Sequence, residues 1–188
     1  MKEFSTKNNF CVFLTQADDL GRVVIPKEIR RTMRIREGDP LEIYTDREGE
    51  VIFKKYSPIG ELGVFASQYA EILSKTSGFG ICITDKDNVI AVSGASKKEL
   101  MDKKISEEME TKIEEKETYV SKKGMSKKVN VIDGGERYSA GLLCPIISEG
   151  DTIGSVVFLS EDGNETYGEV QTKLAETAAG FLAKQMES

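Results

Sequence analysis

The sequence predicts an α+β protein of two modest domains, residues 1–56 and residues 57–188. The first observation is the length of 188 residues, which is more than one small domain usually needs. The second is a change of pattern near residue 57, where short strands and one short helix give way to a long amphipathic helix. The third is that several strands then alternate with turns before a final helix, which favours an antiparallel sheet covered by helices.

The N-terminal domain is predicted to contain short strands, one helix and a hairpin. Its expected elements are strands at 10–14 and 20–25, a helix at 27–33, and strands at 41–46 and 50–55. Pro26 suits the start of the helix because it lacks an N–H, and Gly49 suits the turn between the last two strands. Because about 55 residues are marginal for a self-sufficient core, we expect this domain to borrow its core from a second copy.

Basic residues are concentrated between Leu20 and Arg36. This stretch holds six cations and one acid, Glu28, for a local charge of +5 in a chain of net charge −6. Its cations are Arg22, Lys27, Arg30, Arg31, Arg34 and Arg36. A basic island in an acidic protein indicates an anionic partner, most commonly the phosphate backbone of a nucleic acid. The alternative is a charged helix face that only meets solvent, since such faces are common.

The stretch from Asp18 to Tyr56, DDLGRVVIPKEIRRTMRIREGDPLEIYTDREGEVIFKKY, resembles the N-terminal domain of AbrB-type transition-state regulators. The resemblance implies a swapped-hairpin β-barrel, in which two chains interleave their strands into an intertwined dimer that binds DNA. Arg22, Arg30 and Arg31 match the DNA-binding face of this family. Their planar, permanently charged guanidinium groups suit phosphate oxygens or the edge of a guanine base.

Lys27 and Arg34 complete the predicted DNA-binding set. For Arg34, as for Arg36, a surface ion pair with Glu37 or Asp39 is an equal alternative, because such pairs are common. In this set Arg22, Arg30 and Arg31 follow the family pattern, whereas the role of Arg34 depends on whether it pairs with a nearby carboxylate.

The first strand departs from the family pattern. In the family an arginine and a second basic residue usually precede the acidic pair, whereas this chain has Thr15 and Gln16 before Asp18 and Asp19. The departure puts one of the family's DNA contacts in doubt. The apolar run at 10–14 still favours a strand.

The rest of the chain resembles a sporulation regulator of the same family, which controls gene expression in the forespore of endospore-forming bacteria. The residues that carry this resemblance are Ser57-Pro58-Ile59, Ala91-Val92-Ser93-Gly94, Ser96-Lys97-Lys98 and residues 176–183. It implies a C-terminal GAF domain, a class of domain that usually binds a small molecule in a pocket over its sheet. The sequence indicates neither the ligand nor the ligand-binding residues, although Cys82, Ser93 and Cys144 lie on or beside predicted strands of that sheet.

The C-terminal domain is predicted to begin and end with a helix. Ser57 and Pro58 are the expected N-cap and first residue of the first helix, and Thr166 to Glu169 match a capping box that opens the last. A third helix is expected from Lys97, and a turn at 122–124. The strands expected in between are 80–84, 89–93, 127–132, 137–147 and 152–160.

The composition predicts a soluble, cytoplasmic protein with no catalytic residues, metal, cofactor or membrane partner. No apolar run approaches the roughly 20 residues that span a bilayer, and the N-terminus lacks the features of a signal peptide. The chain has no histidine, which excludes Ser–His–Asp and Cys–His catalysis within it. Cys11, Cys82 and Cys144 are widely spaced, which fits neither a disulfide framework nor a zinc site.

Two functions from different classes fit these observations. The first is a sequence-specific DNA-binding regulator of sporulation genes, a dimer or a tetramer, whose GAF domain senses a small molecule. The second is a thiol enzyme of GAF fold, like a methionine-sulfoxide reductase, which requires low-pKa cysteines close together. Cys82 and Cys144 lack basic neighbours, so we predict the regulator. An antitoxin with the same N-terminal fold would carry a disordered tail rather than the predicted second domain.

Overall fold

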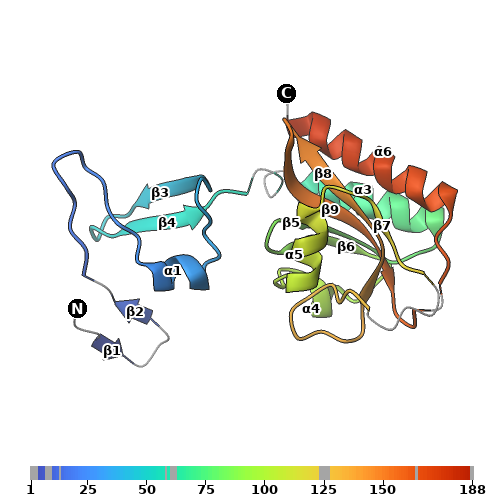
Figure 1. Cartoon of the computed structure of the whole chain (residues 1–188), viewed down its shortest axis with the longest axis horizontal. Helices are drawn as coiled ribbons and strands as arrows, with labels where there is room; N and C mark the ends of the chain where they lie inside the picture. Colours follow the sequence, from blue (N-terminus) through green and yellow to red (C-terminus); the bar gives the residue numbers. More distant parts are fainter. Residues whose placement is uncertain are drawn as a thin grey trace. The chain divides into compact units, whose positions relative to one another are not determined.

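The computed structural model describes residues 4–6, 10–12, 14–57, 59, 63–122, 128–163 and 165–186, with the backbone alone for residues 4–6 and 10–12. The chain divides into two units, Met1–Tyr56 and Ser57–Ser188, which we describe one after the other (Figure 1). Three predicted features lie outside the described residues: strand residue Phe13, Pro58 at the start of a helix, and most of the turn at 122–124.

The N-terminal unit consists of short elements joined by long connections (Figure 1). They are β1 (Phe4–Thr6), β2 (Phe10–Val12), α1 (Lys27–Thr32), β3 (Leu41–Thr45) and β4 (Val51–Lys55). β1 pairs with β2 and β3 pairs with β4, both antiparallel. The predicted helix and β3–β4 hairpin are thus confirmed, and each of their ends agrees with the prediction to within one residue.

The strand predicted at 20–25 is wrong. Within the described residues this segment forms one isolated antiparallel bridge, between Ala17 and Val23. A strand is stabilised by a row of hydrogen bonds to a neighbouring strand, and in a single chain this segment only folds back on itself. As a result, the apolar side chains of Leu20 and Val24 remain 71% and 73% exposed.

The turn between β3 and β4 is built by an aspartate and a glycine. Asp46 Oδ1 accepts hydrogen bonds from the backbone N–H of Glu48 at 3.0 Å and of Glu50 at 2.8 Å. Gly49 has a φ of 87°, which a residue with a Cβ adopts only with strain. The turn sets the register that places Ile43 opposite Phe53.

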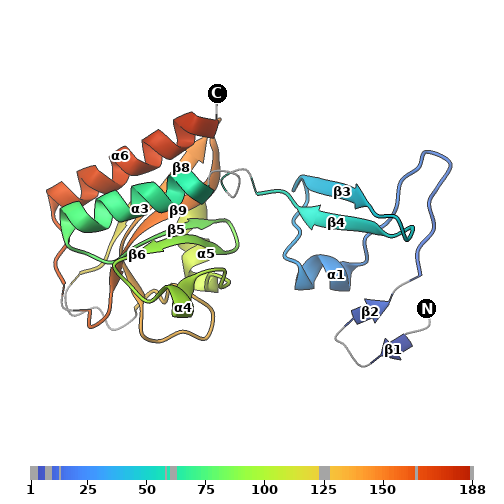
Figure 2. The ribbon, with the colours of Figure 1, turned by 180° about the vertical axis from the view of Figure 1, so that it is seen from behind.

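The C-terminal unit is a five-stranded antiparallel sheet between two pairs of helices. Its elements are α3 (Gly63–Ser77), β5 (Ile81–Asp85), β6 (Val89–Ser93), α4 (Lys97–Leu100), α5 (Glu107–Glu114), β7 (Tyr119–Val120), β8 (Ser139–Ser148), β9 (Asp151–Ser160) and α6 (Glu169–Met186). The strand order is β6-β5-β9-β8-β7. Helices α3 and α6 lie side by side on one face, and α4 and α5 lie on the other (Figures 1 and 2).

The sheet of this unit separates two apolar cores. The core under α3 and α6 contains Ile81, Leu142 and Phe158, and it also receives Ile59, which directly follows the junction between the units. The core under α4 and α5 is built from the alternate residues of the same strands, including Leu143 and Val157. Both cores of the C-terminal unit therefore lie within one chain.

Two local predictions in the C-terminal unit are wrong. The described part of the strand expected at 127–132 forms only isolated bridges, from Asn130 to Ser139 and from Ile132 to Ile105. Helix α6 begins at Glu169, later than a capping box at Thr166 requires. The Gly168 N–H instead donates to Gln171 Oε1 at 2.9 Å, so the side chain that reaches back to the helix start lies two residues further on.

Candidate nucleic-acid interface

The turn from Asp18 to Arg22 holds the first arginine of the predicted interface. Asp18 Oδ1 accepts hydrogen bonds from the backbone N–H of Leu20 at 3.0 Å and of Arg22 at 2.8 Å. Gly21 takes a φ of 73°. Arg22 Nε donates to Asp18 Oδ2 at 2.7 Å, while the Arg22 side chain stays 72% exposed. The backbone N–H and the guanidinium of Arg22 lower the pKa of Asp18, so a carboxylate orients this arginine.

Asp18 is a positioning residue that the sequence analysis did not assign. The signal for it was an aspartate four residues before an arginine, with a glycine between them. This spacing favours a turn in which the aspartate accepts backbone N–H groups and leaves its second oxygen for the arginine.

Helix α1 presents Lys27, Arg30 and Arg31 to solvent. All three side chains are exposed, and α1 buries no residue of its own. Arg30 and Arg31 lie in the last turn, where the helix dipole favours positive charge. Neither arginine forms an ion pair with any residue that the structure describes, so both guanidinium groups are available to an external anion.

The C-terminal end of α1 places Arg34 in a left-handed conformation with a φ of 50°. The Arg34 N–H donates to the Arg31 carbonyl at 3.3 Å, and the Ile35 N–H donates to the Arg30 carbonyl at 2.8 Å. This is the hydrogen-bond pattern of a Schellman motif, whose left-handed position is usually glycine. An arginine here is conformationally costly, because its Cβ crowds the following carbonyl.

Asp39 was one predicted ion-pair partner of Arg34 or Arg36. Its carboxylate pairs with Lys55 of β4 at 3.1 Å and accepts the Arg36 backbone N–H at 2.9 Å. Burial raises the pKa of Asp39, but the Arg36 N–H, the Lys55 ammonium and the charge of Arg36 outweigh burial, and the net pKa is lowered, so Arg36 does act on this carboxylate. Because the folded pKa lies below the unfolded one, this carboxylate stabilises the unit at neutral pH. That stabilisation is lost as the pH falls through the folded pKa.

Thr15 and Gln16, the residues that depart from the family pattern, are both exposed. The Thr15 hydroxyl donates to the Val24 carbonyl at 3.2 Å, across the hairpin that contains the Asp18 turn. Thr15 therefore supports the backbone of this hairpin, and neither residue supplies the positive charge found there in the family.

One group of acidic residues in the described chain has the spacing of a metal site. The carboxylate oxygens of Asp46, Glu48 and Glu50 lie within 4.8 Å of one another, and all three residues are exposed. Asp46 already accepts two backbone N–H groups in the β3–β4 turn. The turn itself explains why these residues lie together.

The two cysteines whose side chains are described lie on opposite faces of the C-terminal sheet. Cys82 of β5 is paired with Val157, and Cys144 of β8 is paired with Val156, the preceding residue of β9. Since successive residues of a strand point to opposite faces, the two thiols belong to different cores. Burial raises the pKa of both thiols. The described residues therefore hold no pair of neighbouring low-pKa cysteines.

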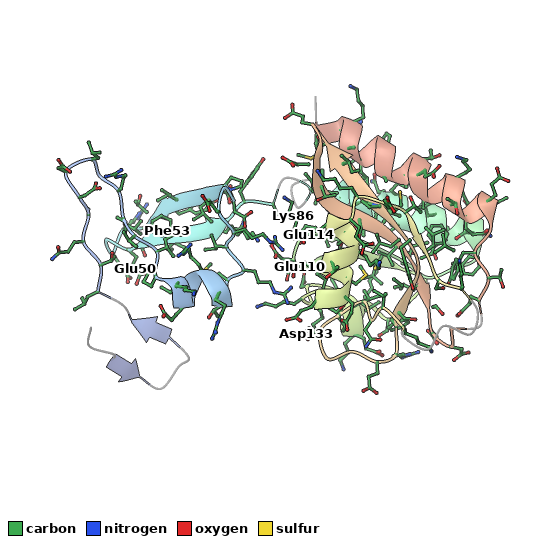
Figure 3. The ribbon with its side chains drawn as sticks, viewed as in Figure 1. Glu50, Phe53, Lys86, Glu110, Glu114 and Asp133 are labelled. Atoms are coloured by element: carbon green, nitrogen blue, oxygen red, sulfur yellow. The ribbon has the colours of Figure 1, made fainter. Side chains whose placement is uncertain are left out.

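The C-terminal unit carries the opposite charge from α1. Residues 1–56 contain 11 basic and 10 acidic residues, which leaves 15 basic and 22 acidic residues for 57–188. Figure 3 shows Glu110, Glu114 and Asp133 along one side of this unit, on and beside α5. The C-terminal unit as a whole is therefore less attractive to a phosphate backbone than the N-terminal unit.

The chain combines an AbrB-like strand–helix–hairpin domain, with exposed arginines, and an antiparallel sheet with flanking helices. This combination defines a transcription regulator that carries a GAF-like domain. The chain belongs to the family of stage V sporulation protein T. The family model described as "Stage V sporulation protein T C-terminal, transcription factor" matches residues 61–187. Stage V sporulation protein T of Bacillus subtilis (strain 168) is 54% identical over 171 residues, which cover 90% of this chain and 94% of that protein.

The N-terminal unit has relatives of its own. A family model described as "Antidote-toxin recognition MazE, bacterial antitoxin" matches residues 14–60. The transition state regulatory protein AbrB of Bacillus subtilis (strain 168) is 60% identical over 43 residues, which cover 23% of this chain and 44% of that protein. These matches confirm the predicted resemblance to AbrB-type regulators.

Solved structures show that the rest of the chain has a GAF-like fold. One is a type II free methionine-R-sulfoxide reductase from Thermoplasma acidophilum, with a TM-score of 0.54 and 9% identity over 69% of this chain and 95% of that one. Another is the GAF domain from Acinetobacter phosphoenolpyruvate-protein phosphotransferase, with a TM-score of 0.53 and 12% identity over 71% of this chain and 84% of that one. At such low identities the likeness concerns the fold alone. In the described part of the chain, no helix is both long and apolar enough to cross a membrane.

Proposed function

We propose that this chain regulates transcription by binding DNA through the basic residues of its N-terminal unit, in a homo-oligomer. The proposed contact residues are Arg22, Lys27, Arg30, Arg31 and Arg34. The observation that carries this proposal is the exposed pair Arg30 and Arg31, which has no carboxylate partner among the described residues of an acidic chain. Guanidinium groups in this state bind phosphate oxygens strongly, since no internal ion pair has to break.

The thiol-enzyme alternative has less support. It shares the fold of a sulfoxide reductase, but the buried Cys82 and Cys144 lie on opposite faces of the sheet and their pKa values are raised. A raised pKa keeps a thiol protonated and unreactive at neutral pH. We therefore assign the C-terminal unit no catalytic role.

The DNA-binding unit is proposed to be an intertwined dimer. None of its described side chains is buried, although many are large and apolar. The exposed ones are Leu14, Leu20, Val23, Val24, Met33, Ile43, Tyr44, Val51 and Ile52. Apolar surface on this scale indicates an interface, and a second copy with interleaved strands would cover it. Such a dimer would also double the number of arginines that meet one DNA duplex.

A second contact between copies is proposed on α3 and α6. The two helices cover the sheet and stack Tyr69 on Phe181, with ring centroids 5.2 Å apart. Their outer sides still expose Phe65, Ile72 and Val170. If these surfaces pair across a two-fold axis, two dimers join into a closed tetramer.

The two units are joined by a very short connection. The Tyr56 N–H donates to the Pro40 carbonyl within the N-terminal unit at 3.1 Å. The next residue, Ser57, donates its hydroxyl to Asp85 of the C-terminal unit at 2.8 Å, and Ile59 is fully buried in the C-terminal core. We propose that this joint is stiff, so that a change in the C-terminal unit reaches the DNA-binding unit instead of being absorbed by a flexible linker.

The salt dependence of DNA binding tests the proposed interface. Fluorescence anisotropy titrations of duplex DNA at several salt concentrations give the slope of log affinity against log salt. Replacing Arg30 and Arg31 with alanine should reduce this slope by about 0.9 for every phosphate group that the protein no longer neutralises. Arg47→Ala removes an arginine of the same unit at the β3–β4 turn and should leave the slope unchanged. A double variant that keeps the slope of the unchanged protein would contradict the assignment.

A further inference from the structure

A groove runs along α3 at the edge of the C-terminal sheet. It offers about 920 Å³ of largely open space between one side of α3, the edge strand β6 and helix α4. This volume lies at the upper end of the range of small-molecule sites. The groove is distinct from the proposed DNA-binding residues, all of which lie in the N-terminal unit.

The floor of the groove is apolar. Ile90 and Val92 come from β6, and Met101 comes from the end of α4. Ile90 also packs against the core under α3 and α6, so the floor is anchored in the fold. An apolar portion of a ligand would find a firm surface here.

The rim of the groove has an excess of positive charge. Glu71 and Lys75, one turn apart on α3, are paired at 2.5 Å. The hydrogen bond and the charge of Lys75 lower the pKa of Glu71, and the charge of Lys97 from α4 adds to the effect. Lys97 itself forms no ion pair with any described residue. Two ammonium groups around one carboxylate leave a net charge of +1, which favours an anion.

Unused hydrogen-bonding side chains lie in the same groove. Ser67 and Gln68 of α3 and Ser93 of β6 line it, and their side chains form no hydrogen bond with the described protein. Small-molecule sites characteristically combine an apolar surface with a few polar groups of this kind.

The opposite face of the sheet is packed against α4 and α5 through the second apolar core. Ile105 and Met109 are fully buried there. The hydroxyls of Thr84 and Ser155, also fully buried, bond each other at 2.8 Å. Of the three residues that were expected near a pocket, Cys82 and Cys144 lie in the two cores, and only Ser93 lines the groove.

We propose that the groove between α3, β6 and α4 binds a small organic monoanion with an apolar portion. Its carboxylate meets Lys97 and the unused hydroxyls of Ser67 and Ser93, and its apolar part lies on Ile90 and Met101. The site is built within one chain and does not depend on DNA binding. A ligand here contacts α3, the helix that follows the joint between the two units.

The test uses the full-length chain with ¹³C-labelled methionine methyl groups and 3-phenylpropionate as the probe. Met101 lines the groove, whereas Met109 is buried in the core on the other face of the sheet and serves as an internal control. The aromatic ring of the probe should shift the Met101 methyl signal in a saturable way and leave the Met109 signal in place. The uncharged 3-phenylpropanamide, which has the same ring and chain length, should bind more weakly.

Two lysine variants decide whether the charge is recognised. Lys97→Gln should weaken the binding of 3-phenylpropionate about threefold to fivefold, as expected for a partly exposed ion pair. Lys98→Gln makes the same change at an exposed neighbour that does not line the groove, and it should bind like the unchanged protein. An unchanged Met109 signal shows that each variant is folded. The proposal is overturned if the probe does not shift the Met101 signal. It is also overturned if the Lys97→Gln variant binds 3-phenylpropionate as tightly as the unchanged protein does, or if the unchanged protein binds the amide as tightly as 3-phenylpropionate.

Discussion

The two units of this chain solve the problem of a hydrophobic core in opposite ways. In the C-terminal unit, side chains as large as Phe158, Leu142 and Met109 are fully buried on the two faces of one sheet. In the N-terminal unit, none of the described side chains is buried, and apolar residues such as Ile43 and Val24 are mostly exposed. The comparison teaches that a folded chain does not have to bury all of its apolar side chains within one copy. The C-terminal unit has its cores within one chain, whereas the N-terminal unit has the exposed apolar surface that the proposed second copy would cover.

Charge follows the same division. The N-terminal unit has a net charge of +1 with its cations gathered around α1, whereas the C-terminal unit has seven more acidic than basic residues. Because acidic surfaces repel a phosphate backbone, this division of charge is consistent with the DNA contact proposed for the N-terminal unit. The unit without a core of its own is thus also the one equipped to bind DNA.

The largest expected effect is a loss of stability of the C-terminal unit. A Cβ added to Gly154 of β9 would lie 2.0 Å from the backbone carbonyl oxygen of Thr84 on β5. Backbone atoms in the middle of a sheet have no room to move aside, so Gly154→Ala should lower the free energy of unfolding of the C-terminal unit by about 3 kcal/mol or more. Urea unfolding followed by circular dichroism measures the change.

Gly180→Ala is the matched control for this substitution. Gly180 lies in α6, has no atom within 4 Å of an added Cβ and does not have a positive φ. The same change there should raise the free energy of unfolding by about 0.5–1 kcal/mol, because alanine favours helix. If the two variants were equally stable, close backbone packing would not be what limits this sheet.

An intermediate effect concerns the joint between the two units. Operators that carry two binding sites at varied spacing should be bound with affinities that differ by about tenfold, because stiffly joined units reach only some spacings. Inserting a Gly/Ser segment of about ten residues after Tyr56 should flatten this dependence while keeping binding to a single site. A spacing dependence that survives the insertion would show that the joint is not what sets the distance between DNA-binding units.

The smallest effect compares one substitution in both units. Arg34 and Glu149 both adopt a positive φ, of 50° and 51°, in a conformation that favours glycine. Arg34→Gly and Glu149→Gly should each stabilise their own unit by up to about 1 kcal/mol by relieving this strain. Only Arg34→Gly should also weaken DNA binding, since Glu149 lies in the β8–β9 turn of the other unit. If neither variant changes DNA affinity, Arg34 has to be removed from the proposed interface.

Much of the fold was predictable from the sequence where local chemistry decides it. Pro26 before α1 and Gly49 in the β3–β4 turn act through their own backbone preferences, and both elements form where expected. The strand predicted at 20–25 failed for a non-local reason, because one chain offers it no neighbouring strand. The strand expected at 127–132 failed in a similar way, since only scattered bridges hold its described part.

For the candidate site, too, the sequence predicted local features better than contacts between distant residues. The arginines were visible as a charge pattern, and the structure places Arg22, Arg30 and Arg31 on exposed positions. The role of Asp18 in orienting Arg22 has a local signal in the spacing of the two residues, whereas the pairing of Asp39 with Lys55 joins residues that no local spacing connects. The groove along α3 combines residues from three elements, a proximity that the sequence does not reveal.

The most direct test of the central claim is a nuclear Overhauser experiment on a mixed oligomer, in which only half of the chains carry ¹³C-labelled methyl groups. Isotope filtering then selects contacts between different copies of the full-length chain. The account predicts intermolecular signals between the Leu20–Val24 segment of one protomer and the β3–β4 hairpin of the partner subunit. If these apolar residues gave signals only within one chain, or none at all, the N-terminal unit would not be completed by a second copy.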